Sequence, residues 1–132
     1  MYKLSKASIE KLEGVHTDLV RVVVLAIQHT KVDFTVLEGV RSLERQEELF
    51  NSGASNTMNS RHLTGHAVDL GAWVGGIRWD WPLYYKIADA MKLSAVRLGG
   101  INVEWGGDWE TFKDGPHFQL SWNHCPLDNT SF

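Results

Sequence analysis

Apolar residues recur at two different spacings along this chain, and the order of those spacings limits the fold more than any other feature of the sequence. A spacing of three to four residues, which predicts an amphipathic helix, runs through 17–30, 42–53 and 80–96. Alternation of apolar and polar residues, which predicts a strand, occurs at 34–40, 66–74, 102–107 and 117–122. We therefore predict an α+β fold, in which a mainly antiparallel sheet packs against helices.

Residues that favour helix ends support this assignment. Candidate N-caps precede each predicted helix, at Ser5 or Ser8, Thr17, Ser42 and Asp80. Gly53 is the candidate C′ residue that ends the helix beginning after Ser42. The short first helix, after Ser5 or Ser8, is expected to turn Ile9 and Leu12 inward. In the helix predicted over 17–30, the valines make a strand the rival assignment for 20–27, but the length of the amphipathic pattern favours a helix.

Composition narrows the class of protein. The 132 residues suit a single domain spanning 1–132, and the net charge of −3 argues against a nucleic-acid partner. The single cysteine, Cys125, excludes an intrachain disulfide and lies in a polar end segment, as a bystander thiol would. The apolar run 22–27 is too short to span a bilayer, and the first residues lack the apolar core of a signal peptide. We expect a monomer that binds no nucleic acid and inserts into no membrane.

The segment SRHLTGHAVDL, residues 60–70, contains two histidines and one aspartate. Catalytic zinc sites usually take three protein ligands from His, Asp, Glu or Cys. Strand alternation places Asp69 on a face of small residues, where a ligand has room beside it. His62 precedes the strand, and Gly65 allows the chain to bend back toward Asp69, whereas alternation turns His66 to the opposite face. A bulge in the strand would reverse that choice between the histidines.

The segment KDGPHFQL, residues 113–120, supplies a third ligand and an acid. Asp114 and His117 are separated by two residues, across a Gly-Pro turn that enters a predicted strand. Such a turn can hold an acid beside a metal ligand without placing both on the metal. The better ligand set is therefore His62, Asp69 and His117, with Asp114 nearby to handle protons.

Together these segments resemble a known family. SRHLTGHAVDL matches the Ser-x-His-x-x-Gly-x-Ala-x-Asp pattern of zinc peptidases of the D-alanyl-D-alanine carboxypeptidase class, and DGPH matches the Asp-x-x-His element of the phage endolysin branch. FTVLEGVRSLERQEELF and VEWGGDW extend the resemblance to roughly residues 30–122. The sequence looks most like phage L-alanyl-D-glutamate endopeptidases, which implies the zinc D-Ala-D-Ala carboxypeptidase fold, also called hedgehog-like.

The resemblance implies a role for each matching residue. Zn²⁺ would be the cofactor, held by His62, Asp69 and His117, and would activate water and polarise the peptide carbonyl. Asp114 would accept the proton of the attacking water and later protonate the leaving amine. Arg41 matches an arginine thought to polarise the scissile carbonyl, and Ser60 is expected to hydrogen-bond the substrate or a ligand.

Several of these residues also have a simpler structural interpretation. Arg41 could instead pair with Glu38 or Glu44. His66 is expected to support a ligand from behind or to line the cleft, and Asp108 either orients His117 or lies at the surface. Surface positions are expected for the histidines without a partner pattern, which are His16, His29 and His124.

The tryptophans divide into two groups. Trp105 and Trp109, in EWGGDW just before the Asp114 turn, could form a substrate wall, although core packing is an equal alternative. Trp73, Trp79 and Trp81 are expected in the core or in hairpin packing.

The resemblance implies an endolysin that hydrolyses the L-Ala–D-Glu bond of bacterial peptidoglycan and lyses the host. Such an enzyme would be made in the host cytoplasm without a signal peptide and would reach the cell wall at lysis with the help of a holin. No separate wall-binding domain is expected. Two alternatives are a D,D-carboxypeptidase or dipeptidase of the same fold, and a non-catalytic wall-binding module that keeps the metal for stability.

Overall fold

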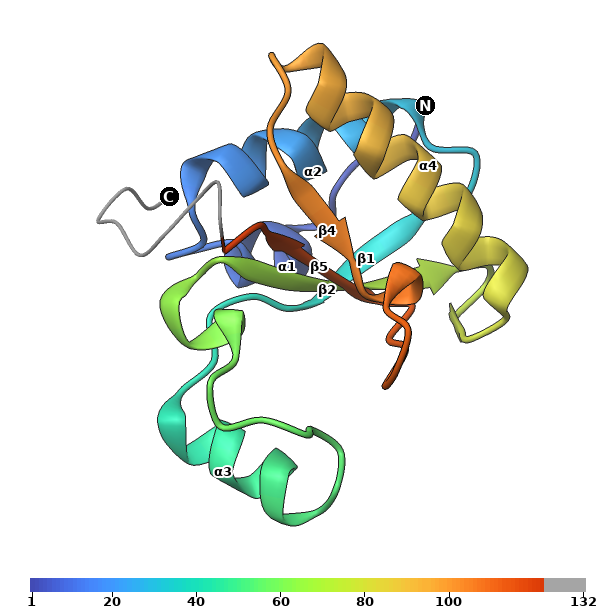
Figure 1. The fold of residues 1–132 in the computed structure, drawn as a ribbon. Coiled ribbons are helices and arrows are strands. Elements are labelled where there is room, and N and C mark those ends of the chain that lie inside the picture. The colour runs from blue at the N-terminus through green and yellow to red at the C-terminus, as the bar shows by residue number, and fades with distance from the viewer. Residues whose placement is uncertain (123–132) are drawn as a thin grey trace.

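The computed structural model describes residues 1–122, which form an antiparallel sheet covered by helices (Figure 1). The strands are β1 Phe34–Glu38, β2 Ala67–Trp73, β3 Ile77–Arg78, β4 Val103–Trp105 and β5 His117–Leu120. The helices are α1 Lys6–Lys11, α2 Thr17–His29, α3 Leu43–Asn51 and α4 Trp81–Arg97, with 3-10 turns η1 Arg61–Thr64 and η2 Gly106–Asp108. The sheet order is β1-β2-β5-β4, with β3 paired to β2, and each of these pairings is antiparallel. The predicted α+β class is confirmed.

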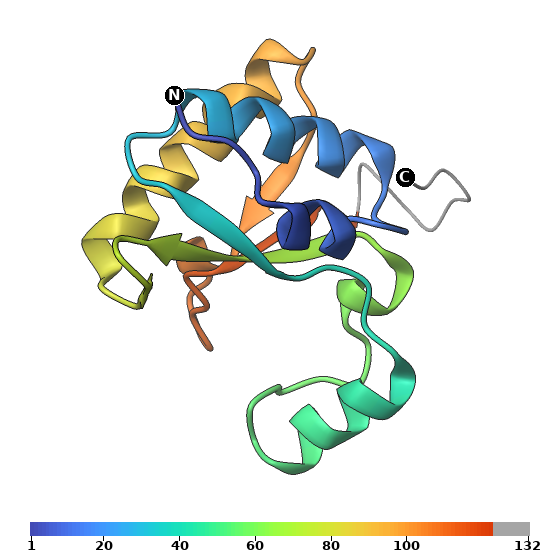
Figure 2. The same ribbon diagram turned by 180° about the vertical axis from the view of Figure 1, so that it is seen from behind.

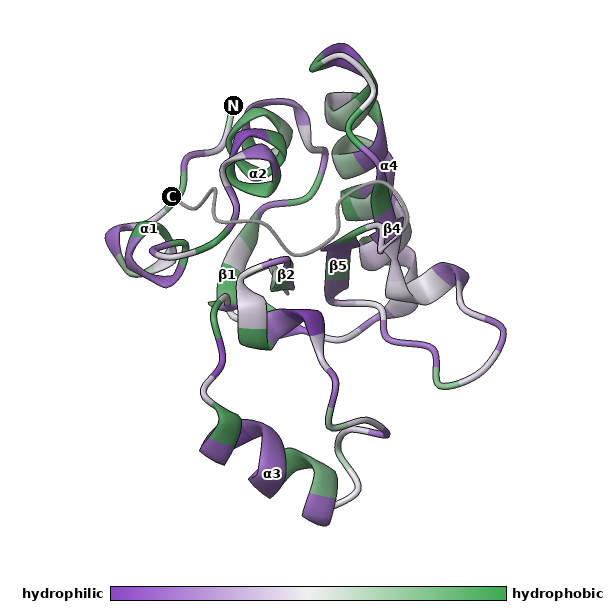
Figure 3. Ribbon diagram, turned by 60° about the vertical axis from the view of Figure 1, so that its left-hand side comes forward, coloured by the Kyte–Doolittle hydropathy of each residue, from purple (hydrophilic) through white to green (hydrophobic). Residues whose placement is uncertain are grey.

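The hydrophobic core lies between the sheet and the helices α2 and α4 (Figures 1 and 3). Alternation along β2 turns Val68, Leu70 and Ala72 into this core, where each is fully buried, as the sequence predicted. Phe118 and Leu120 of β5 enter the same layer. Burying an apolar side chain of this size contributes about 1.5–3 kcal/mol, so this face of the sheet is firmly fixed in register.

The opposite face of the sheet carries polar residues. Figure 2 shows α3 and the loop that follows it extending away from the sheet, on the side not covered by α2 and α4. Because side chains alternate along a strand, a core face made of Val68 and Phe118 requires Asp69 and His117 to face this second side. One face of the sheet therefore carries the hydrophobic core, and the other carries the candidate site residues.

Helix α2 begins one residue earlier than predicted. His16, rather than Thr17, is the N-cap, and its Nδ1 accepts a hydrogen bond from the Asp18 backbone N–H at 3.1 Å. The backbone N–H of His16 donates to Gly65 O at 2.8 Å, which brings the ring under η1 and leaves it 4% exposed. The predicted surface position of His16 is wrong, because a cap that also joins two segments is buried between them.

Helices α1 and α3 each bury a polar residue, and Leu12 at the end of α1 is buried as predicted. In α1, Ser8 is buried and Ile9 is half exposed, because the Ser8 hydroxyl accepts from Val36 N–H at 2.9 Å on β1. In α3, Gln46 is fully buried while Leu43 and Phe50 are exposed. Helix α3 therefore packs around a polar contact and not against the hydrophobic core.

The three tryptophans around the β2–β3 hairpin are exposed to a large extent. Trp73, Trp79 and Trp81 keep 46%, 62% and 42% of their surface exposed, so of the two predicted alternatives the core position is wrong and packing around the hairpin remains. Trp79 stacks on Tyr84, with ring centroids 6.4 Å apart, next to the hairpin. Cys125 and His124 lie outside the described residues. None of the helices within 1–122 has the length and apolar character needed to span a membrane.

Candidate metal centre

Three polar residues are neighbours across the sheet. Asp69 of β2 is paired with Glu38 of β1 on one side and with His117 of β5 on the other. Residues directly opposite one another on antiparallel strands project to the same face. The pairing of β2 with β5 therefore brings together Asp69 and His117, which are nearly fifty positions apart in the sequence.

His62 reaches Asp69 from η1. The Ser60 hydroxyl caps this turn by accepting from the His62 backbone N–H at 3.2 Å, and the His62 carbonyl accepts from Arg41 N–H at 2.9 Å. Gly65 ends η1 with a φ of 78°, and a Cβ at this position would collide with the carbonyl oxygen of Gly14. A glycine is required here, so the bend predicted at Gly65 is confirmed.

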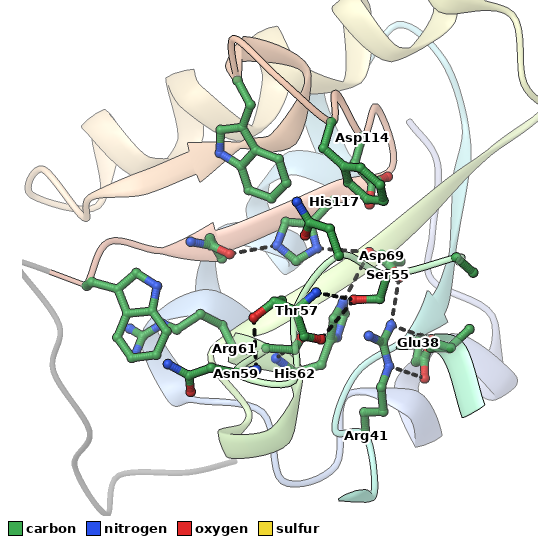
Figure 4. Close-up of a pocket in the computed structure, with 18 residues that line it drawn as sticks. Glu38, Arg41, Ser55, Thr57, Asn59, Arg61, His62, Asp69, Asp114 and His117 are labelled. Carbon is green, nitrogen blue, oxygen red and sulfur yellow. Dashed lines mark hydrogen bonds and ion pairs between the residues drawn. The ribbon is translucent and has the colours of Figure 1, made fainter. Parts of the chain in front are cut away.

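The three predicted ligands form a compact cluster. His62 Nε2 and His117 Nδ1 each lie 3.2 Å from Asp69 Oδ1, and all three ligand atoms lie within 4.8 Å of one another (Figure 4). Zinc bonds of roughly 2.0–2.2 Å at tetrahedral angles separate neighbouring ligand atoms by about 3.3 Å. The spacing therefore fits a zinc ion with little rearrangement.

Hydrogen bonding directs the ring of His62 toward this cluster. Its Nδ1 lies 2.8 Å from Gly39 O, and because a carbonyl oxygen only accepts, Nδ1 carries the proton. As a metal ligand, the ring then points the lone pair of Nε2 into the cluster. Nε2 is buried and has no hydrogen-bond partner among the described residues. Buried polar atoms are rarely left unsatisfied, and a cation at the centre of the cluster would satisfy this one.

The pKa values of the cluster reflect strong mutual attraction. Burial opposes ionisation of Asp69, but the close polar contacts with His117 and His62 outweigh it and hold its pKa well below the ordinary value. Burial also opposes the charged form of His117, yet its contact with Asp69 raises its pKa above the ordinary value. Without metal, protonation of His117 beside the ionised Asp69 is therefore favoured.

The shifted pKa values of His117 and Asp69 predict how the stability of the metal-free protein depends on pH. The raised pKa of His117 stabilises the metal-free fold fully below about pH 6.5, and this contribution is lost as pH rises through the folded pKa. The lowered pKa of Asp69 contributes above about pH 4 and is lost only as pH falls through its folded value. The metal-free protein should therefore melt at a lower temperature at pH 8 than at pH 6.

Zinc should reverse this trend, because its ligands must be deprotonated. Calorimetry of metal-free and zinc-loaded protein should show the difference in Tm growing as pH rises. A His117→Gln variant, which lacks the titrating pair, is the control. A Tm of the metal-free protein that stays constant or rises from pH 6 to pH 8 would contradict this assignment.

Asp114 lies beside the cluster on a tight turn. Its backbone N–H donates to Gly106 O at 3.1 Å, its carbonyl accepts from His117 N–H at 3.2 Å, and Trp105 Nε1 donates to Gly115 O at 2.7 Å. A Cβ at Gly106 would collide with the Asp114 carbonyl oxygen, so η2 can approach the turn only through a glycine. Burial and the negative charge of Asp69 raise the pKa of the Asp114 carboxyl. These are the conditions of a carboxylate that takes up a proton readily.

Arg41 makes the ion pair with Glu38 that was considered for it, and its guanidinium also reaches the edge of the metal cluster. Its Nε and Nη2 donate to the two carboxylate oxygens of Glu38, each at 2.8 Å, so the predicted pairing with Glu38 exists. Nη1 donates to Gln46 Oε1 at 2.8 Å, and Nη2 lies 3.4 Å from Asp69 Oδ2. The guanidinium is thus held in one orientation at the edge of the metal cluster, where it also lines the cavity.

The cluster opens into a cavity of about 430 Å³. Figure 4 shows polar groups from the loop after α3, including Ser55, Thr57 and Asn59, along one wall. Aromatic side chains complete the lining, and they are Trp109, Phe112 and Trp122. The ring centroid of Trp109 lies 5.1 Å from that of His117. A cavity lined by both polar and aromatic side chains suits an extended peptide.

The three residues predicted to contact substrate differ in position. Trp109 and Ser60 line the cavity. Trp105 does not: it is 3% exposed in the hydrophobic core and stacks near Phe118 at 6.4 Å. The predicted substrate contact of Trp105 is corrected to a supporting role, because β4 alternation turns its ring inward beneath the Asp114 turn.

The structure also separates His66 and Asp108 from the site. His66 is buried, with Nδ1 2.8 Å from Thr64 Oγ1 and its ring near that of His16, outside the ligand cluster. Asp108 is exposed and pairs with Lys92 at 2.6 Å, so it does not orient His117. That position belongs to Gln119, whose Oε1 lies 2.7 Å from His117 Nε2. The sequence reasoning missed Gln119, although strand alternation places it on the same face as His117.

Comparison with known proteins agrees with this geometry. The family described as phage L-alanyl-D-glutamate peptidase matches residues 1–121. The L-alanyl-D-glutamate peptidase of Listeria phage A118 is 33% identical over 96% of this chain, and this chain spans 44% of the length of that relative.

Two solved structures are similar. The Serratia marcescens L-Ala D-Glu endopeptidase ChiX superposes with a TM-score of 0.85 at 52% identity, over 92% of both chains. The vancomycin-resistance D,D-dipeptidase VanXYg, at 23% identity, has a TM-score of 0.52 over 79% of this chain and 49% of its own, and shows the fold alone. The predicted resemblance and fold are confirmed, and the chain belongs to the phage L-alanyl-D-glutamate peptidase family.

Proposed function

We propose that this protein is a zinc-dependent endopeptidase that hydrolyses the L-Ala–D-Glu bond of the peptidoglycan stem peptide. The observation that carries the proposal is the convergence of His62 Nε2, Asp69 Oδ1 and His117 Nδ1 beside the Asp114 turn. The L-Ala–D-Glu peptidase activity for which the A118 and ChiX relatives are named supports this choice of bond. Residues 1–132 would then act as a single catalytic domain.

The zinc ligands in this proposal are His62, Asp69 and His117. A zinc ion bound there would supply Lewis acidity to the scissile carbonyl and to the attacking water. Asp69 provides the negative charge of the site, and the two neutral imidazoles are oriented by Gly39 and Gln119. The ligand set leaves one side open toward the cavity, where the peptide enters.

Asp114 is the proposed general base and acid. Its raised pKa favours uptake of the proton from the attacking water, and the same carboxyl then returns that proton to the leaving amine. Arg41 is proposed to stabilise the developing oxyanion from the edge of the cluster, with Glu38 and Gln46 holding its guanidinium in place. Trp109 and Ser60 are proposed to contact the peptide.

Relatives from phages suggest a biological setting. We infer that the enzyme is an endolysin, made in the host cytoplasm and released to the cell wall at lysis through a holin. Bacterial peptidoglycan is then its partner.

Digestion of purified peptidoglycan tests the proposal. Mass spectrometry with N-terminal labelling should identify released peptides that begin with glutamate, and no new reducing sugar ends should form. The Asp114→Asn variant is the matched control and should release almost none of these peptides.

Two other results would contradict the proposed bond or the proposed activity. Release of free D-alanine would indicate a D,D-carboxypeptidase or dipeptidase of the same fold. Binding to the wall without any released fragment, in the presence of zinc, would indicate a non-catalytic wall-binding module.

A further inference from the structure

A chain of hydrogen bonds runs from the metal cluster across β5 and β4. His117 Nε2 lies 2.7 Å from Gln119 Oε1, and Gln119 Nε2 donates to Glu104 Oε2 at 3.4 Å. Gln119 is 7% exposed, and its register partner on β4 is Glu104. The same strand alternation that turns Phe118 into the core places Gln119 and His117 on one face.

The hydrogen bonds from Glu104 through Gln119 to His117 allow only one orientation of the Gln119 amide. An ionised carboxylate accepts hydrogen bonds and cannot donate, so Glu104 requires the amide nitrogen of Gln119 to face it. The amide oxygen must then face His117, where it accepts the proton of Nε2. The reverse amide orientation would place its oxygen against the carboxylate and its NH₂ group against His117. Glu104 therefore determines which atom Gln119 offers to the imidazole.

We propose that Gln119, oriented by Glu104, is a positioning residue that keeps the proton of His117 on Nε2 and so presents the Nδ1 lone pair to the metal. The inference rests on the proposed zinc site and deepens it. His117 Nδ1 is the atom that faces Asp69 Oδ1, 3.2 Å away. A proton on Nδ1 would occupy the position of the metal.

The arrangement matches that of His62, whose Nδ1 proton is held by Gly39 O. Each histidine thus has its outer nitrogen bound to an acceptor and its inner nitrogen directed at the cluster. The two supports differ in kind. The Gly39 carbonyl belongs to the backbone and cannot be removed by substitution, whereas Gln119 and Glu104 are side chains. Loss of such a support to a ligating histidine typically weakens metal binding by roughly 10–100-fold.

Variants of the full chain test the inference by zinc affinity, measured through competition with a chelator. Gln119→Met keeps the length of the side chain but removes the amide, and should weaken zinc binding by roughly 10–100-fold. Glu104→Gln lets the Gln119 amide adopt either orientation and should weaken it by a smaller factor. The double variant Gln119→Glu with Glu104→Gln exchanges the two groups, keeps the net charge and retains an acceptor at His117. It should restore affinity close to that of the wild type.

A spectroscopic measurement separates positioning from folding. In the cobalt-substituted protein, the ring N–H protons of ligating histidines give shifted proton resonances whose exchange with water can be followed. The His117 Nε2–H should exchange faster in Gln119→Met, while the His62 Nδ1–H, bound to Gly39, serves as an internal reference. Asp108→Asn, which neutralises an exposed acid paired with Lys92, is the matched control for Glu104→Gln and should leave both signals and zinc affinity unchanged.

The possible outcomes are distinct. Weaker zinc binding and faster His117 N–H exchange in Gln119→Met, both reversed in the double variant, support the positioning role. A lower Tm with unchanged zinc affinity and unchanged exchange shows that Gln119 only stabilises the fold, and overturns it. If the wild-type protein itself binds no zinc, the proposed metal site fails and the inference falls with it.

Discussion

Replacing Asp114 with Asn is expected to lower kcat on peptidoglycan by roughly 10²–10⁴-fold, the range typical of a lost general acid–base group. Asn has the shape of Asp but cannot take up or return a proton. The zinc content should not change, because Asp114 lies outside the ligand cluster. Turnover of a labelled muropeptide, combined with metal analysis of the same sample, measures both quantities.

The same substitution should raise stability at neutral pH. The pKa of Asp114 is raised in the folded state, chiefly by burial and next by Asp69, so its ionised form opposes folding at any pH above that value. A neutral Asn removes this opposition. Glu110→Gln, at an exposed acid on the same loop, is the matched control and should change neither activity nor Tm. If Asp114→Asn retained wild-type kcat, a different group would have to move the proton.

Replacing His62 with Asn is expected to abolish both zinc binding and activity. The Asn amide can still donate to the Gly39 carbonyl in place of Nδ1, so the fold should survive, but no atom replaces Nε2. The loss of affinity should exceed the roughly 10–100-fold that accompanies loss of a mere supporting hydrogen bond. Chelator competition and peptide release, measured on the same preparation, check this expectation.

His66→Asn is the matched comparison, because it changes the other histidine of the same motif. An amide there can keep the contact with Thr64 Oγ1, and the ring lies outside the cluster. This variant should bind zinc with wild-type affinity even if its Tm falls. Loss of zinc in His66→Asn, with retention in His62→Asn, would reverse the ligand assignment.

The sequence was sufficient for the parts of the fold that periodicity controls. Alternation through Val68, Leu70 and Ala72 set both the core face of β2 and the outward position of Asp69. Ser42 and Asp80 likewise occupy the N-cap positions of α3 and α4 as predicted, although only Ser42 caps its helix through the side chain, while Asp80 pairs with Arg78. These are local effects of backbone geometry, and they can be inferred without tertiary structure.

The errors concern residues whose environment is decided by distant parts of the chain. His16 is buried because it joins α2 to Gly65, and Ser8 is buried because it bonds to β1. Leu43 and Phe50 of α3 are exposed, and the helix is anchored instead by Gln46, whose amide bonds to Arg41 and to the loop residues Ser55 and Thr57. Polar contacts of this kind depend on pairing across the fold, which periodicity does not report.

In the candidate site, too, the residues in local motifs were predicted, and a residue that depends on tertiary pairing was not. The sequence and its resemblance brought together the three ligands and Asp114, because those residues lie in short motifs. Gln119 was missed although it lies only two residues from His117, because an amide has no motif of its own. Its importance depends on the β4–β5 register, which places Glu104 beside it.

The most direct test of the zinc site is anomalous diffraction from zinc-soaked crystals, measured on both sides of the zinc absorption edge. We expect one strong anomalous peak about 2.0–2.2 Å from His62 Nε2, an Asp69 carboxylate oxygen and His117 Nδ1. Asp114 should lie close to this peak without binding it. A peak bound by His66, or the absence of any peak between these three residues at saturating zinc, would contradict the assignment of the metal centre.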